Sequence, residues 1–177
     1  MTHDDVLDQI AVLPPSSQRD AYIEFVSSRG DASLRRDGGP EHVTASCFVF
    51  SPDLESTLLC FHRKGNFWVQ FGGHIEPEDD TVADAAVREA REESGIHDLT
   101  LLTESIVDLN RHELNSGFSC ATHWDVGFVA IADPHATITV SDESEDVRWF
   151  PLHDLPPNTP DGLTTRLDHA KTAIIAL

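Results

Sequence analysis

Three glutamates, Glu89, Glu92 and Glu93, lie close together in the middle of the chain. On an α-helix, residues three and four apart share one face, so the three carboxylates would be neighbours. Like charges at this spacing destabilise a helix by roughly 0.2–0.5 kcal/mol per pair, and anions near its C-terminal end oppose the helix dipole. A sequence that accepts both costs indicates a need for clustered carboxylates. Such oxygen ligands suit Mg²⁺, Mn²⁺ or Ca²⁺.

The surrounding residues predict the helix that carries these glutamates. Asp80 or Thr81 can cap its first turn, several alanines favour its interior, and Gly95 stands where a glycine would end it. The alternative is a solvated acidic face with neighbouring arginines as counter-charges. We disfavour this alternative because the glutamates follow a Gly72–Gly73 turn and an acidic loop in a particular order.

Residues 72–96 resemble the Nudix box, the signature of Nudix hydrolases. That box reads Gly, five residues, Glu, seven residues, then Arg-Glu-apolar-Xaa-Glu-Glu-Xaa-Gly-apolar. Residues 88–96 fit its second half position by position. The first half departs, because Gly73 lies one residue too far from the second half and Asp80 (or Asp79) replaces the expected Glu. We interpret this as one extra loop residue together with a conservative exchange of acids.

The resemblance implies a role for each matching residue. Glu89, Glu92 and Glu93, with the main-chain carbonyl of Gly72, would bind Mg²⁺ (or Mn²⁺). Arg88 would hold the carboxylates in place by ion pairing. Metal bound in this way neutralises charge on phosphate oxygens and lowers the pKa of a water molecule.

Two groups outside the box are further candidates. In the family the general base is either a box glutamate or a glutamate of a later loop, and here Glu143 is favoured over Glu145. The alternative is that both are ordinary solvated loop acids. Arg63 and Lys64 supply most of the positive charge just before the glycines. They either contact a substrate phosphate or form a solvated hairpin tip.

The expected reaction is hydrolysis of a phosphoanhydride bond, in a nucleoside diphosphate linked to another group or in a nucleoside triphosphate. One alternative is a Nudix-like domain that senses nucleotides without hydrolysing them. Another is an isoprenoid diphosphate isomerase on the same fold, which needs a reactive cysteine and a divergent box. The intact box glutamates argue against both alternatives, although the positions of Cys47 and Cys60 are open.

Composition limits the partners. The chain has 177 residues with 31 acidic and 12 basic side chains, a formal charge of −19. Such a surface repels nucleic-acid phosphates and anionic lipids, so we expect neither nucleic acid, including messenger-RNA caps, nor membrane as a partner. A small nucleotide-type substrate is the expected ligand. No signal-peptide or membrane-spanning pattern is visible, which favours a cytoplasmic protein. A homodimer is one alternative for the oligomeric state.

The remaining pattern predicts an α/β protein. Two short helices are expected before residue 31, strands over 42–50, 57–63, 99–109, 122–132 and 147–150, and a last helix over 163–175. Together with the resemblance, this predicts a Nudix-type α/β/α sandwich around a mixed sheet. The predicted division is an N-terminal helical extension over 1–40 and a Nudix hydrolase domain over 41–177. The extension is a dimer arm, a lid over the site, or simple surface packing.

The other metal-binding residue types give no pattern. The three cysteines are scattered without a Cys-Xaa-Xaa-Cys spacing, so a zinc site built on cysteines is not expected. The ten histidines are dispersed, and no spacing among them indicates a transition-metal site. His123 and Asp125 would share one face of a strand and Trp124 the other. That pair faces either a ligand or another part of the sheet.

Overall fold

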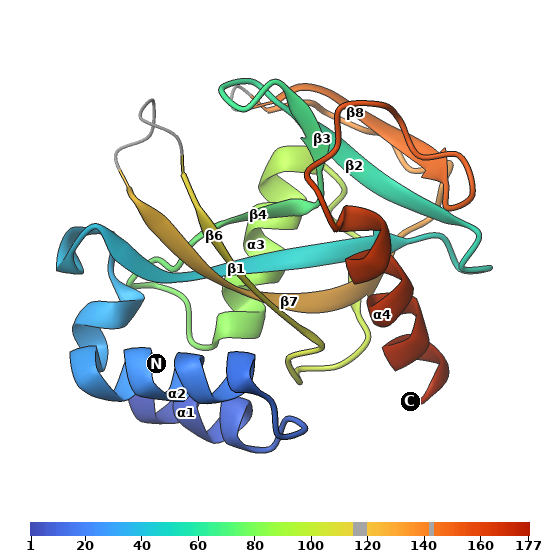
Figure 1. Cartoon of the computed structure of the whole chain (residues 1–177). Coiled ribbons are helices and arrows are strands. Elements are labelled where there is room, and N and C mark those ends of the chain that lie inside the picture. The colour runs from blue at the N-terminus through green and yellow to red at the C-terminus, as the bar shows by residue number, and fades with distance from the viewer. Residues whose placement is uncertain (115–119, 142–143) are drawn as a thin grey trace.

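The computed structural model describes residues 1–114, 120–141 and 144–177 (Figure 1). In chain order its elements are α1 (His3–Ala11), α2 (Ser17–Arg29), the 3₁₀ helices η1 (Gly30–Leu34) and η2 (Arg36–Gly38), β1 (Glu41–Phe50), β2 (Ser56–His62), β3 (Phe67–Val69), β4 (Phe71–His74), α3 (Val82–Ser94), β5 (Thr100–Leu101), β6 (Asp108–Glu113), β7 (Thr122–Ile131), β8 (Ser144–Pro151) and α4 (Leu163–Ile175). The two expected N-terminal helices, the helix over the glutamates and the C-terminal helix are confirmed. Within the described residues, no helix has the length and apolar character needed to cross a membrane.

Strand β1 is the centre of a mixed sheet. It runs parallel to β7 over its whole length, from Glu41 opposite Thr122 to Phe50 opposite Ile131. It pairs antiparallel with β2 and with β4. Strands β3 and β8 continue the sheet on the β2 side, while β5 and β6 pair with β7. The predicted mixed sheet is therefore confirmed.

Alternate residues of β1 enter two separate hydrophobic clusters. Val43, Ala45 and Val49 pack in the cluster that contains the buried residues of α1, α2 and α3. Phe48 and Phe50 point to the opposite face and pack with α4. Because successive side chains of a strand alternate between faces, one strand contributes to both cores. Figure 1 shows α3 behind the sheet and α4 in front of it, so the predicted α/β/α sandwich is confirmed.

The N-terminal helices share the core on the α3 side. Tyr22 of α2 meets the Trp124 ring edge-on at a centroid distance of 5.0 Å, and its hydroxyl donates to the carbonyl oxygen of Asp125 at 2.8 Å. Phe25 stacks on Trp124 at 4.4 Å. Val6 and Ile10 of α1 are fully buried in the same cluster. The division of the chain at residue 40 stays a prediction.

Two expected strands have different bounds. Residues 99–109 do not form one strand, because main-chain bonds to β7 extend only to Leu102 N–H at one end and begin again at Val107 N–H. In the gap, the main-chain N–H of Ser105 donates to the Thr103 hydroxyl at 3.1 Å, a local bond that competes with sheet pairing. Strand β8 is longer than expected because it pairs with β2 from Ser144 to Pro151. The sequence Asn115-Ser116-Gly117 predicts a loop, and these residues lie outside the described ones.

Candidate active site

Helix α3 begins and ends at the residues that cap it. The Thr81 side chain accepts from the main-chain N–H of Asp84 at 3.0 Å, and the Asp84 carboxylate accepts from the N–H of Thr81 at 3.1 Å. This reciprocal capping box makes Thr81, not Asp80, the first cap. Gly95 ends the helix in the left-handed conformation with φ 71°. The helix thereby fixes where its carboxylates project.

Arg88 makes hydrogen bonds to several acidic residues of the site. Its guanidinium donates two hydrogen bonds of 2.9 Å to the Asp79 carboxylate, from Nε and Nη2. Nη1 donates to Glu89 Oε1 at 2.9 Å and to Glu92 Oε2 at 3.3 Å. Nη2 also donates to the His74 carbonyl at 2.9 Å. One side chain therefore connects helix α3, the acidic loop and strand β4.

The ionised form of Asp79 is stabilised despite its burial. Burial alone would raise the pKa of this carboxyl, but hydrogen bonds from Arg88 and from the main-chain N–H of Glu76 outweigh it and lower the pKa. The Glu76 N–H lies 2.8 Å from Asp79 Oδ2. In turn, the hydrogen bond to Asp79 is the main cause that raises the pKa of Arg88. The pair remains charged near neutral pH.

This contact identifies the acid of the loop. Asp79 follows Gly73 after five intervening residues, as the box pattern requires, and is buried, whereas Asp80 is exposed. The extra residue therefore lies between Asp79 and Arg88, at the entry to the helix. The sequence put Asp80 first and Asp79 second for this position, and the ion pair with Arg88 favours Asp79 instead.

The box glutamates differ in their surroundings. Glu89 and Glu92 converge on Nη1 of Arg88, which shows that these two carboxylates can face one positive charge. The Glu92 side chain is 60% exposed, whereas Glu93 is buried. Glu93 lies beside Cys60 of β2, where burial and the Glu93 carboxylate raise the pKa of the thiol. All three side chains offer oxygen donors, which fit a hard divalent cation.

The absence of a side chain at Gly73 leaves space for the Glu89 carboxylate. A Cβ atom built on Gly73 would lie 2.5 Å from the carboxyl carbon of Glu89, so the carboxylate lies against the bare main chain. Gly72 faces the other side of β4, where a Cβ would meet Ser46 at 2.7 Å. The sequence Gly72–Gly73 is thus required by close approach on both faces of the strand.

A cleft lies on the α4 side of the sheet, next to the glycine pair, with a volume of about 130 Å³. It is lined by residues of β1, β2, β3, β4, β6 and β7 and of the segments that follow β3 and β6, namely Thr44, Ser46, His62, Phe67, Val69, Gln70, Gly72, Gly73, His112, Leu114, His123 and Asp125. Asp125 accepts from Ser46 Oγ at 2.7 Å, Thr44 Oγ1 at 3.1 Å and Arg166 Nη2 at 2.9 Å. These bonds fix the carboxylate in the buried floor of the cleft.

The structure shows which of the other candidate ligand-facing residues line the cleft. His123 and Asp125 both line the cleft, and the Asp125 carboxylate also bonds to the sheet residues Thr44 and Ser46, so this pair faces both the cleft and the sheet. Trp124 is instead buried against α2 on the opposite face. Arg63 and Lys64 are exposed in the turn after β2 and do not line the cleft, and Arg63 Nη2 donates to the Ser144 carbonyl at 3.2 Å.

The proposed general base is not located. Glu143 lies outside the described residues. Glu145 is exposed on β8, the strand whose first residue, Ser144, accepts the hydrogen bond from Arg63. No described contact connects Glu145 to the glutamates of α3.

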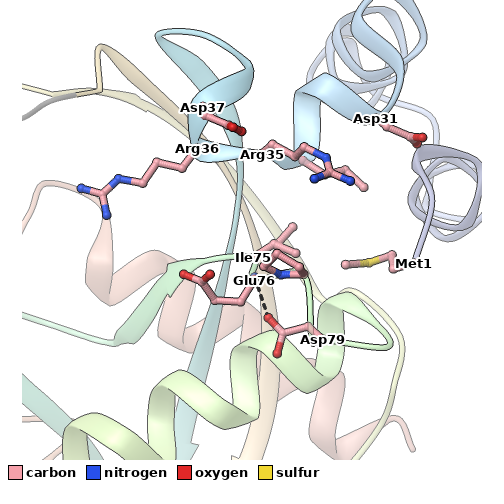
Figure 2. A pocket seen from close by; sticks show the side chains of 10 residues that line it. Met1, Asp31, Arg35, Arg36, Asp37, Ile75, Glu76 and Asp79 are labelled. Carbon is pink, nitrogen blue, oxygen red and sulfur yellow. Dashed lines mark hydrogen bonds between the residues drawn. The ribbon is translucent and has the colours of Figure 1, made fainter.

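A second pocket, of about 440 Å³, lies between the N-terminal region and the acidic loop of the box. Met1, Arg35 and Arg36 line one side, and Ile75 and Asp79 line the other (Figure 2). The N-terminal region therefore borders the loop that holds Arg88. Of the three alternatives for the extension, the lid over the site is the one that predicts such a position, and its role stays a prediction.

Three histidines that are dispersed in the sequence meet in the folded chain. His42, His74 and His123 lie together with Cys120, and one ligand atom from each falls within 4.8 Å of the others. Burial lowers the pKa of His74 to about 4 and that of His123 to about 3, so both rings are neutral near pH 7. The signal that the sequence offered was a polar alternation along β1, His42-Xaa-Thr44-Xaa-Ser46.

The comparisons with known proteins agree with this geometry. A family model for the NUDIX domain matches residues 40–169. An Ap4A hydrolase of C. elegans, solved as a binary complex, is 18% identical with a TM-score of 0.63, over 76% of this chain and 98% of that chain. A NUDIX-family hydrolase from Clostridium perfringens is 22% identical with a TM-score of 0.60, over 76% and 97%.

A third solved structure, the E. coli dihydroneopterin triphosphate pyrophosphohydrolase, is 17% identical with a TM-score of 0.58, over 78% of this chain and 97% of that chain. At these identities the solved structures show a shared fold. No curated protein sequence matches the chain. The family model, which covers most of the chain, shows more: the chain belongs to the Nudix hydrolase family.

Proposed function

We propose that this chain hydrolyses a phosphoanhydride bond in a nucleotide with the help of Mg²⁺ or Mn²⁺ bound by helix α3. The observation that carries the proposal is the Arg88 network, which directs Glu89 and Glu92 to one positive charge. Membership of the family supports a hydrolase that acts on pyrophosphate bonds. The three solved neighbours named above include an Ap4A hydrolase and a dihydroneopterin triphosphate pyrophosphohydrolase.

Each residue of the site has a proposed role. Glu89, Glu92 and Glu93, with the Gly72 carbonyl, would hold the cation, which supplies charge neutralisation at the phosphates and a more acidic water. Arg88 positions Glu89 and Glu92, and Asp79 positions Arg88. These residues act together, because a misplaced carboxylate would weaken the binding of the cation and the positioning of the substrate.

The cleft beside Gly72 is the proposed place for the nucleoside. Phe67 and His112 line it from β3 and β6, so a base could stack on either ring. Asp125, fixed by three hydrogen bonds in the floor, would accept from an N–H or O–H of the ligand. Positive charge for the outer phosphates is available from Arg63 and Lys64, which are exposed beside this region.

The cysteines argue against the isomerase alternative. Cys47 is fully buried, and burial raises the pKa of its thiol to about 12. Burial and Glu93 raise the pKa of the Cys60 thiol as well. Both thiols are therefore protonated and shielded, which is the opposite of a reactive cysteine.

Hydrolysis of a panel of nucleoside diphosphate derivatives and triphosphates, with Mg²⁺ or Mn²⁺, tests the proposal. We expect turnover of at least one compound, and Glu92→Gln and Glu93→Gln should abolish it. Glu104→Gln is the matched control, because Glu104 is an exposed glutamate outside the box. Unimpaired turnover in both box variants would refute the assignment. Tight nucleotide binding without any turnover would favour the sensing alternative.

A further inference from the structure

Four potential metal ligands meet in a group that includes His123 of the cleft lining. His42 comes from β1, His74 from β4, His123 from β7, and Cys120 from the segment just before β7. The three imidazole rings lie 4.9, 5.2 and 5.3 Å apart between centroids. Cys120 Sγ lies 3.6 Å from His74 Nε2. His42 is fully buried and Cys120 is 8% exposed, so the group is largely shielded from solvent.

Sheet register explains why these residues meet. His42 lies directly opposite His123 in the parallel β1–β7 pair. His74 lies opposite Thr44, two residues along β1 from His42, and so on the same face of the sheet. The three histidines of the cluster therefore come from strands that are fixed by main-chain hydrogen bonds.

The donors and their spacing fit a tetrahedral transition-metal ion. Bond lengths of about 2.3 Å for Zn–S and about 2.0–2.1 Å for Zn–N place two tetrahedral ligands, one sulfur and one nitrogen, about 3.6 Å apart. This matches the separation of Cys120 Sγ and His74 Nε2. The remaining ligand atoms need only close in from separations of up to 4.8 Å. We infer that His42, His74, His123 and Cys120 form a closed Zn²⁺ site.

The competing explanation is a packed group of imidazoles without an ion. His123 argues against it, because its Nε2 atom is buried and has no hydrogen-bond partner among the described residues. A fourth ring, His112, packs against His123 at 5.5 Å, but its Nδ1 atom is already bonded to Asn110 Oδ1 at 2.9 Å. A buried nitrogen without a partner is uncommon in proteins, and a metal ion would satisfy it.

This site is distinct from the glutamates of α3. Its nitrogen and sulfur donors suit zinc, whereas carboxylates suit Mg²⁺ or Mn²⁺. The two groups also face opposite sides of β4, since Gly73 faces Glu89 and His74 faces the cluster. Four protein ligands leave no open position, which is typical of a structural zinc site.

The zinc would act on the active site through β4. The side chain of His74 is a ligand, while its carbonyl accepts from Arg88 at 2.9 Å. Bound metal would therefore fix the strand that carries Gly72 and Gly73 against β1 and β7. This inference does not depend on the proposed hydrolysis, because it concerns binding and spectroscopy alone.

Co²⁺ titration of the chelator-treated full chain, with Mg²⁺ in large excess, tests the inference. We expect one Co²⁺ per chain, the intense visible bands of a four-coordinate ion and a near-ultraviolet thiolate charge-transfer band. Zn²⁺ should displace it. Cys120→Ser should remove the charge-transfer band. His123→Gln should weaken binding at least about 100-fold, since even outer-shell partners of a metal account for about 10–100-fold.

Two variants are controls for this titration. His135→Gln removes an exposed histidine outside the cluster, and Glu92→Gln removes an exposed box glutamate. Both should bind Co²⁺ with the wild-type spectrum and affinity. Absence of stoichiometric binding, a six-coordinate spectrum, or equal affinity in wild type and His123→Gln would overturn the inference. So would loss of the bands in Glu92→Gln.

A thiol measurement on the wild-type chain needs no substitution. Cys47 and Cys60 are buried, with pKa values raised by burial, so both should react slowly with an alkylating reagent in the folded protein. Zn²⁺ at one equivalent should slow alkylation of Cys120, identified by peptide mass mapping, at least about tenfold, because the metal binds the thiolate that would react. An unchanged rate at Cys120 would overturn the inference even if the variants failed to fold.

Discussion

Asp79 and Arg88 are joined by two hydrogen bonds of 2.9 Å from different nitrogens of one guanidinium. The two residues lie nine positions apart, one in the acidic loop and the other on helix α3. Such bidentate pairs fix orientation as well as charge. Through Arg88, the loop therefore determines where Glu89 and Glu92 point.

Asp79→Asn should destabilise the protein and reduce activity. It removes one ionic partner from a largely buried pair, and hydrogen bonds to charged groups contribute about 1.5–3 kcal/mol each to stability. Asp80→Asn is the matched control, because Asp80 is the adjacent acid and is exposed. Denaturant unfolding and hydrolysis rates of the two variants would show which of the two acids pairs with Arg88. A larger effect in Asp80→Asn would contradict the assignment of the loop acid.

The same pair predicts a loss of stability in acid. The pKa of Asp79 in the folded protein lies below its ordinary value of 3.8, so the unfolded chain takes up a proton first as the pH falls. The stabilisation is present above that ordinary value and is lost as the pH falls through the folded pKa. Unfolding free energies measured from about pH 6 to about pH 2 should decline less steeply in Asp79→Asn than in wild type. Equal slopes would show that Asp79 is not the responsible group.

Alanine at the two glycines should have different consequences. In Gly73→Ala the new Cβ would meet the Glu89 carboxylate, which can move, so the fold should persist while hydrolysis falls about 10²-fold. In Gly72→Ala it would meet the Ala45 carbonyl oxygen at 2.8 Å, which is main chain. That variant should lose about 1–3 kcal/mol of stability through overpacking. Melting curves and steady-state hydrolysis rates of the two variants check this difference. A larger loss of stability in Gly73→Ala than in Gly72→Ala would contradict it.

Arg166 should matter for the fold. It donates to both Asp108 and Asp125, and its side chain is 14% exposed. Arg166→Leu would leave two buried carboxylates facing each other, and loss of one partner of a buried ion pair costs about 3–5 kcal/mol. Arg148→Leu, at a position 64% exposed, should change stability by about 0–1 kcal/mol. Chemical denaturation would show whether the two arginines differ in this way.

The sequence predicts helix α3 well because its signals are local. Thr81 and Asp84 cap the start, Gly95 ends the helix, and the three- and four-residue spacing places the glutamates together. The same local reasoning could not decide between Asp79 and Asp80, since the choice depends on which acid reaches Arg88 across the folded loop.

The sequence does not predict which residues of distant strands lie opposite each other in the sheet. His42 and His123 meet because β1 and β7 pair in parallel, although 81 positions separate them (123 − 42). His74 joins them through a different, antiparallel pairing with β1. No spacing along the chain encodes such a meeting, and the polar alternation along β1 does not say which residues lie opposite it. The pocket between the N-terminal region and the box loop could not be predicted either, because it also depends on contacts between distant parts of the chain.

The central claim is that the glutamates of α3 support hydrolysis of a phosphoanhydride bond. Its most direct test is product analysis in ¹⁸O-labelled water with Mg²⁺, comparing wild type, Glu93→Gln and the exposed-site control Glu104→Gln. We expect wild type and Glu104→Gln to release a phosphorylated product that carries one solvent oxygen, and Glu93→Gln to release none. Labelled product from Glu93→Gln at the wild-type rate would contradict the claim.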